Sequence, residues 1–234
     1  MTIFKSETAL YSRYAIYVLP PEPLAGFGAS WLGWDLAAGR SVPRLKIPEL
    51  DHSDLAGITA APRKYGLHGT LKAPFHLAPG TSEADLRNAV DALAATLAPA
   101  AVQGLSLARI GRFLALVPDG DAKGLAYIAQ TCVSVLDPFR APATRDDLAR
   151  RRVAGLSPRQ DRNLLTWGYP YVFEDFRFHI TLTGKLDRAE MDHVAGILAD
   201  RLPPAPRPFV LDRISLVGET PEGFRLIHHA PLTG

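Results

Sequence analysis

The sequence predicts an α+β fold of two pseudo-symmetric lobes, each an antiparallel sheet flanked by helices, with an active cleft between them. Two observations predict this fold. A strand carrying His-x-Thr occurs twice, at 65–75 and at 176–184. Each of these strands is followed by an amphipathic helix and then by a hairpin. A pattern written twice in one chain indicates two similar units, and a twofold relation would bring both motifs to a shared cleft.

The composition is typical of a soluble globular protein. The 234 residues are 47% hydrophobic and 21% charged, with a net charge of +2, so no general affinity for nucleic acid or acidic membrane is expected. Cys132 is the single cysteine, which excludes an intrachain disulfide and a thiolate metal cage. The apolar stretch 14–19 ends at two prolines and is too short for a signal peptide core. We therefore expect a cytoplasmic location and no membrane contact.

The first half reads as a regular series of strands and helices. Residues 13–19 are rich in β-branched and aromatic side chains, which predicts a strand. The further predicted elements are a helix at 23–38, an irregular loop at 39–61 with a short helix near Asp54, the strand at 65–75, a helix opening at Thr81, and strands at 104–109 and 112–117.

The second half repeats this order. After the strand at 176–184, Asp187 with Glu190 three residues on predicts a capped helix, and strands follow at 209–217 and 224–229. We place one domain over 1–234, with lobes at about 13–120 and 172–234 and with the N-terminal strand available to pair across them.

Between the lobes lies an insert at 121–171 that is helical, basic and aromatic. Helices are predicted at 122–136 and 144–152 and from 156 to 167. Two interpretations stay open, namely a flap over the cleft and a solvated connector.

The two motifs point to acid–base chemistry on a phosphate. Side chains alternate faces along a strand, so His68 shares a face with Thr70, and His179 shares one with Thr181. Histidine titrates near neutral pH and can take a proton from an attacking water or give one to a leaving oxygen. Threonine hydroxyls can hold the non-bridging oxygens. Two such pairs around one phosphate require neither a metal nor a nucleophilic side chain, so no cofactor is expected.

The sequence around these motifs resembles that of a known family. Residues 62–75, the run Leu156-Ser157-Pro158-Arg159-Gln160 and the run 167–171 are similar to the 2H (two-histidine) phosphoesterase superfamily, in its branch of phosphonate metabolism proteins of unknown function. The superfamily includes 2′-5′ RNA ligase-like proteins and cyclic nucleotide phosphodiesterases, and the branch is typically encoded in phosphonate (phn) operons. The resemblance covers essentially the whole chain. It implies a metal-independent cyclic phosphodiesterase, with His68 and His179 as acid and base, in phosphonate catabolism.

Several residues beside the motifs are candidates for substrate binding. Lys72 shares the parity of His68, and Arg177 that of His179, so both cations are expected on the cleft face. The full set of candidates is Tyr65, Lys72, Arg63, Arg177 and Tyr171.

We expect a hydrolase acting on a cyclic or 2′-linked phosphodiester, such as a 2′,3′-cyclic nucleotide or a ribose cyclic phosphate. The alternative is an accessory protein that binds a phosphorylated metabolite or an RNA end without turnover. A third hypothesis is that the insert docks onto an enzyme of the phosphonate pathway. The sequence leaves open which histidine is the acid and whether the reaction runs toward hydrolysis or ligation.

Overall fold

The computed structural model describes residues 10–234, and it confirms the α+β class. Seven strands form one sheet in the order β11-β10-β1-β4-β8-β7-β6, and every neighbouring pair is antiparallel. The strands of this sheet are β1 (Tyr14–Val18), β4 (Gly69–Phe75), β6 (Gly104–Ile110), β7 (Phe113–Asp119), β8 (Ile180–Thr181), β10 (Arg213–Glu219) and β11 (Phe224–Pro231). Two small sheets pair β2 (Trp34–Asp35) with β3 (Arg40–Ser41), and β5 (Ala100–Val102) with β9 (Phe209–Leu211).

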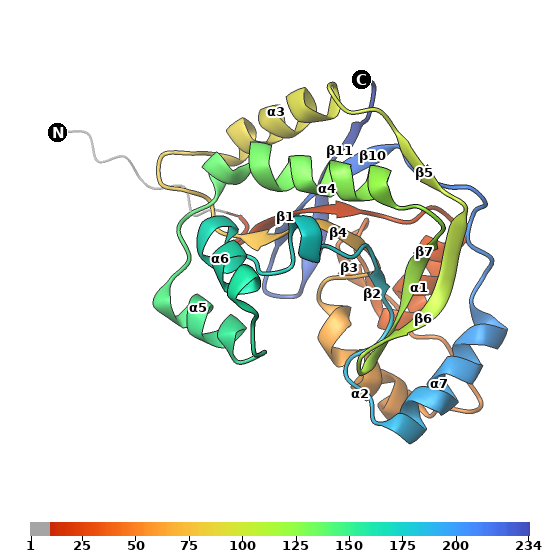
Figure 1. Cartoon of the computed structure of the whole chain (residues 1–234). Coiled ribbons are helices and arrows are strands. Elements are labelled where there is room, and N and C mark those ends of the chain that lie inside the picture. Colours follow the sequence, from red (N-terminus) through yellow and green to blue (C-terminus); the bar gives the residue numbers. More distant parts are fainter. Residues whose placement is uncertain (1–9) are drawn as a thin grey trace.

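Helices flank the large sheet (Figure 1). They are α1 (Leu24–Leu32), α2 (His52–Arg63), α3 (Glu83–Ala94), α4 (Lys123–Val135), α5 (Arg145–Arg152), α6 (Pro158–Trp167) and α7 (Arg188–Arg201), with short 3-10 turns at Asp137–Phe139 and Phe173–Asp175. Among residues 10–234, no helix is long and apolar enough to cross a membrane.

Local signals in the sequence fix the helix starts. Ser82 and Asp187 each accept a hydrogen bond from the third residue of the helix that follows, and that residue's carboxylate accepts one back. These capping boxes satisfy N–H groups that a helix start otherwise leaves without partners. The predicted cap at Asp187 with Glu190 is confirmed.

The two halves are interleaved rather than consecutive. The helix that follows the first motif, α3, packs on β10 and β11 from the end of the chain, whereas α7 packs on β6 and β7. Each motif is thus followed in sequence by a hairpin that belongs to the other half of the sheet. The predicted boundaries at about 13–120 and 172–234 therefore need correction, because each half draws strands from both ranges. The N-terminal strand does bridge them, since β1 lies between β10 and β4.

The insert also divides into two parts. The buried side of α4, with Leu125, Ile128 and Cys132, belongs to the main hydrophobic core and packs on β4. Helices α5 and α6 contact each other and stand beside the sheet, on the side opposite α2 and α7 (Figure 1). Only the later part of the insert is therefore placed where it can border a cleft.

Candidate active site

The two motifs meet at the centre of the sheet. Gly69 of β4 lies directly opposite Ile180 of β8 in an antiparallel pair. Each is the middle residue of its His-x-Thr, so His68 lies across from Thr181, and Thr70 lies across from His179. Because Gly69 and Ile180 face the opposite way, the four motif side chains share one face of the sheet.

This close approach requires glycine at position 69. A Cβ atom at that position would lie 2.5 Å from Cζ of Phe178, which is closer than packed carbon atoms approach. The absence of a side chain lets the first motif strand lie against the second.

The four motif residues line one cavity. Its volume is about 410 Å³, and His68, Thr70, His179 and Thr181 all contribute to its wall. An adjoining cavity of about 620 Å³ shares Thr70 and His179 with it. We call these two adjoining cavities together the histidine cleft.

Both imidazoles are held in the same way. Nδ1 of His68 lies 2.9 Å from the carbonyl oxygen of Gly66, and Nδ1 of His179 lies 2.8 Å from that of Arg177. A carbonyl oxygen can only accept, so Nδ1 carries the hydrogen in each ring, and Nε2 is the nitrogen available for proton transfer. Nε2 of His68 also lies 3.0 Å from Oγ1 of Thr70. The two histidines therefore have the same tautomer, as the twofold relation between the motifs would require.

The environment of His68 is more enclosed than that of His179. The ring of Tyr17 stacks on its imidazole with centroids 3.6 Å apart and planes 18° apart. Burial disfavours the charged imidazolium and, together with the nearby His179, lowers the pKa of His68 to about 4, although the hydrogen bond to Gly66 acts the other way. His68 is consequently neutral at pH 7.

Three of the predicted binding residues line the histidine cleft. Tyr65 contributes to the motif cavity and stacks on Phe224. Tyr171 and Arg177 line the adjoining cavity instead. The strand predicted through Arg177 is shorter than expected, since β8 comprises Ile180–Thr181, and the guanidinium of Arg177 donates to the carbonyls of Glu174 and Phe176.

The prediction that Lys72 shares the face of His68 is wrong. Tyr17 pairs with Thr70 but Ile16 pairs with Lys72, so Leu71 is an extra residue that forms a bulge in β4. The bulge inverts the alternation. Lys72 is only 3% exposed, and its ammonium donates to the carbonyl of Val133 and pairs with Asp137.

Arg63 is also placed away from the cleft. Its guanidinium donates to Oγ of Ser41 and lies over the ring of Trp34. It is the last residue of α2, and its side chain turns toward β3. Arg63 therefore makes contacts within the fold and does not line the cavity.

Several side chains of the cleft are not predicted by the sequence. Tyr17, Arg13 and Lys185 line the motif cavity, as do Arg151 and Tyr169 from the insert. Arg13 and Tyr17 lie in the strand predicted at 13–19, but no local pattern showed that this strand would lie beside the first motif. Lys185 follows the second motif closely, and that proximity was the one available signal.

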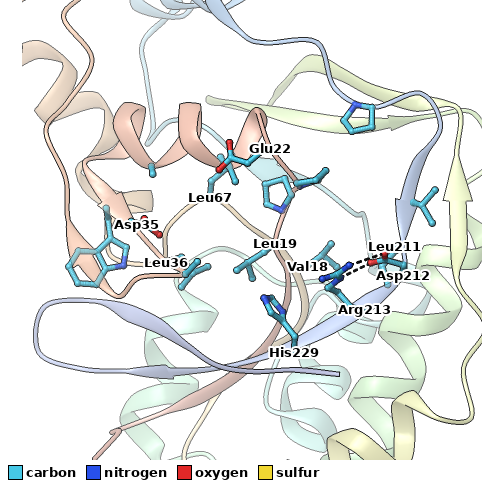
Figure 2. A pocket seen from close by; sticks show the side chains of 18 of the residues that line it. Val18, Leu19, Glu22, Asp35, Leu36, Leu67, Leu211, Asp212, Arg213 and His229 are labelled. Carbon is cyan, nitrogen blue, oxygen red and sulfur yellow. Dashed lines mark hydrogen bonds and ion pairs between the residues drawn. The ribbon is translucent and has the colours of Figure 1, made fainter. Parts of the chain in front are cut away.

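Another cavity, of about 480 Å³, contains none of the four motif residues (Figure 2). Its arginine, Arg213, is paired with Asp212, and its carboxylates Glu22 and Asp35 each accept a backbone N–H. No group of three or more His, Cys, Asp or Glu side chains within residues 10–234 is arranged to hold a metal ion.

Fold and site together define an α+β protein with a paired-histidine cleft at the centre of its sheet. Residues 70–227 match the family described as "Protein of unknown function (DUF1045)", and the chain belongs to that family. The match includes Thr70, His179 and Thr181.

Two curated relatives are similar over most of this chain. A ribose 1,5-bisphosphate phosphokinase PhnN of Janthinobacterium sp. (strain Marseille) is 40% identical over 188 residues, which is 80% of this chain and 42% of the relative. A protein of the same name from Laribacter hongkongensis (strain HLHK9) is 38% identical over 189 residues, covering 76% and 42%. The chain thus spans less than half the length of these relatives.

Two solved structures are similar in fold to this chain. E. coli LigT in its apo form is 15% identical, with 97% of this chain and 100% of that chain covered and a TM-score of 0.48. TT0787 of Thermus thermophilus is 17% identical, with 95% and 98% covered and a TM-score of 0.45.

Proposed function

We propose that this protein is a metal-independent phosphoesterase that opens a cyclic phosphodiester, with a 2′,3′-cyclic nucleotide or a ribose cyclic phosphate as substrate. The observation that carries the proposal is the meeting of two His-x-Thr motifs across the Gly69–Ile180 pair, with all four side chains in one cavity. A hydrolysis needs two proton transfers, and each can be carried out by one of the two histidines. The two hydroxyl groups of the same cavity wall can donate to the phosphate oxygens.

The neutral state of His68 makes this ring the base of the reaction. His68, whose pKa is lowered by burial, accepts a proton from water through Nε2 while the water oxygen bonds to phosphorus. His179, as imidazolium, gives its Nε2 proton to the ribose oxygen as the bond from that oxygen to phosphorus breaks. The product is a phosphomonoester with a free ribose hydroxyl. Proton exchange with solvent restores both rings.

The threonines stabilise the charge that develops on phosphorus. In the pentacoordinate state the non-bridging oxygens carry more negative charge than in the substrate, and hydroxyl donors placed beside them lower the barrier. Lys185 lines the same cavity and adds positive charge there.

The relatives support a ribose phosphate as the product. Their name states an action on ribose 1,5-bisphosphate, and this chain matches 42% of their length. Opening a ribose cyclic phosphate would yield a phosphorylated ribose of the kind that such a kinase consumes. The PhnN name and the resemblance to phn-operon proteins together support a place in phosphonate catabolism.

The test is hydrolysis in the presence of EDTA. Purified protein is incubated with adenosine 2′,3′-cyclic phosphate or ribose cyclic phosphate, and products are followed by phosphorus NMR. We expect turnover by the wild type and its loss in the double variant His68→Ala, His179→Ala. The control is His193→Ala, a histidine of α7 that bonds to the carbonyl of Glu49 and lies outside the cleft.

Two outcomes would contradict the proposal. Turnover that survives in the double variant would place the chemistry elsewhere. Tight binding of a phosphate ligand with no turnover over a broad panel of cyclic phosphates would favour the accessory role instead.

A further inference from the structure

A basic depression adjoins the histidine cleft. Its volume is about 470 Å³, and its wall comes from the start of β1, the end of α2, the end of β4 and helix α5. The side chains that line it include Arg13, Lys64, Arg140, Arg150, Arg151 and His76. Asp147 is the acidic side chain of this wall, within the described part of the chain.

The depression and the cleft share a wall. Arg13, Tyr65, Pro74 and Arg151 line both this depression and the cavity of the two histidines. A molecule held at the histidines by one end can therefore extend into the depression without leaving the protein surface.

The cations of the depression exceed the carboxylates that pair with them. Arg150 pairs with Asp147, Arg140 with Asp137, and Arg13 with Glu219. Lys64 lies 3.8 Å from the same Glu219 and 4.8 Å above the ring of Tyr65, and Arg151 lies 4.9 Å above the ring of Tyr169. Five cationic side chains thus face three carboxylates, which leaves an excess of two positive charges.

That excess matches a phosphomonoester, which carries a charge of about −1.5 to −2 at pH 7. Arginines at the last turn of α5 also complement the helix dipole, and this alone would explain their place on the helix. It does not apply to Arg13 and Lys64, which reach the same depression from two other segments and share one carboxylate, Glu219.

We infer that the basic depression is a subsite for a second phosphate group of the substrate. This inference rests on the proposed function, and it narrows the substrate to a sugar or nucleoside cyclic phosphate that also bears a remote phosphomonoester. The cyclic phosphate lies between the histidines, and the monoester dianion lies among the cations of the depression.

The test compares two substrates that differ in the remote phosphate alone. These are adenosine 2′,3′-cyclic phosphate and the same compound with a 5′-phosphate. We expect the wild type to favour the phosphorylated compound in kcat/KM by on the order of tenfold or more, since hydrogen bonds to charged groups are strong. A dinucleotide ending in a cyclic phosphate carries a singly charged diester instead, and we expect it to gain less.

The variant for this test is Lys64→Ala with Arg150→Ala. Both residues line the depression and not the cavity of the histidines, and their side chains are 48% and 74% exposed, so folding is expected to survive. The ratio of the two kcat/KM values should fall toward one. The matched control is Arg213→Ala, an arginine of the cavity in Figure 2, which should leave the ratio unchanged.

The failures of the two proposals can be told apart. Turnover of both substrates with a ratio near one overturns the subsite and leaves the phosphoesterase standing. If neither substrate turns over, calorimetric binding of adenosine 3′,5′-bisphosphate and adenosine 3′-monophosphate decides the subsite separately. Tighter binding of the bisphosphate that is lost in the double variant supports the subsite, and equal binding of the two ligands overturns it.

Discussion

Tyr17 and Ala115 occupy equivalent positions beside the two motifs. Tyr17 pairs with Thr70 across β1 and β4, and Ala115 pairs with Thr181 across β7 and β8. The backbone is therefore symmetric about the motif pair, but one side carries a large ring and the other a methyl group. This difference gives the two histidines different surroundings, and we propose that it assigns them different roles.

The first prediction concerns the pH dependence of the reaction. A base whose pKa is about 4 stays deprotonated until the pH falls to that value, so the acid limb of kcat/KM should lie near pH 4 in the wild type. Tyr17→Ala exposes the imidazole, weakens the desolvation and raises the pKa of His68 toward its ordinary value of 6.5. We expect the acid limb to move up by ~1 pH unit or more.

The matched control for this prediction is Tyr17→Phe, which keeps the stacked ring and should keep the acid limb in place. Kinetics over about pH 3.5–8, at a substrate concentration well below KM, would suffice, since kcat/KM reports the free enzyme. An acid limb that does not move in Tyr17→Ala would show that His68 is not the base.

A second prediction concerns the two motif threonines. Thr70→Val and Thr181→Val each remove a hydroxyl from the wall of the cleft while keeping the branched shape. We expect each to lower kcat by roughly tenfold to a hundredfold, as expected for the loss of a donor to a developing oxyanion. The measurement is steady-state hydrolysis of a cyclic phosphate. If both variants were as active as the wild type, the two hydroxyl groups would have no role in the mechanism.

Thr183→Val is the contrasting variant. Oγ1 of Thr183 accepts the N–H of Leu114 and donates to the carbonyl of Gly184, and the side chain is buried. Its loss should lower the free energy of unfolding by about 1–3 kcal/mol, because a buried N–H loses its partner. Chemical denaturation separates this effect from a loss of catalysis.

A third prediction concerns the contact between the motif strands. Gly69→Ala places a methyl group 2.5 Å from Cζ of Phe178, so either the ring or β4 must shift. We expect a loss of about 1–3 kcal/mol in the free energy of unfolding from overpacking, together with a fall in kcat. The double variant Gly69→Ala with Phe178→Leu should recover part of both losses. Absence of any recovery would mean that the glycine matters for another reason.

A fourth prediction separates Lys72 from the substrate. Burial lowers the pKa of Lys72 to about 8 from an ordinary 10.5, although Asp137 acts the other way. Between those values the unfolded chain binds more protons than the folded protein, so folding stability due to this residue rises with pH. Relative to Lys72→Met, the wild type should gain on the order of 1 to 3 kcal/mol from pH 8 to 10.5.

Activity gives the second readout for Lys72. Asp137 keeps its pairing with Arg140 when the ammonium is removed, so the fold should tolerate methionine there. We expect KM for a cyclic phosphate to change less than about twofold, as for a residue outside the site. A large rise in KM would show that Lys72 contributes to substrate binding.

The sequence predicted the local elements well because their signals are local. The capping pair of Asp187 with Glu190 and the turn between 104–109 and 112–117 each depend on residues a few positions apart. The meeting of the motifs could also be anticipated, since repetition implies symmetry. The repetition therefore predicts that His68 and His179 share a cleft.

What the sequence did not reveal depends on pairings between distant segments. The bulge at Leu71 arises from the register of β4 against β1, and no property of residue 71 itself announces it. The predicted strand 209–217 is split at Asp212, because β9 pairs with β5 while β10 joins the large sheet. Tyr17 and Arg13 belong to the cleft because β1 lies beside β4, which is again a pairing of distant segments.

The interleaving of the halves has a consequence for how the chain is made. Tyr14 has its strand partner at Gly218, so this edge of β1 stays unpaired until the segment around Gly218 has left the ribosome. A break anywhere between 120 and 178 would produce two fragments, of which the first holds β6 and β7, which lie beside β8, and the second holds β10 and β11, which lie beside β1. Such fragments should regain a working cleft only when mixed, because each carries one of the two motif histidines.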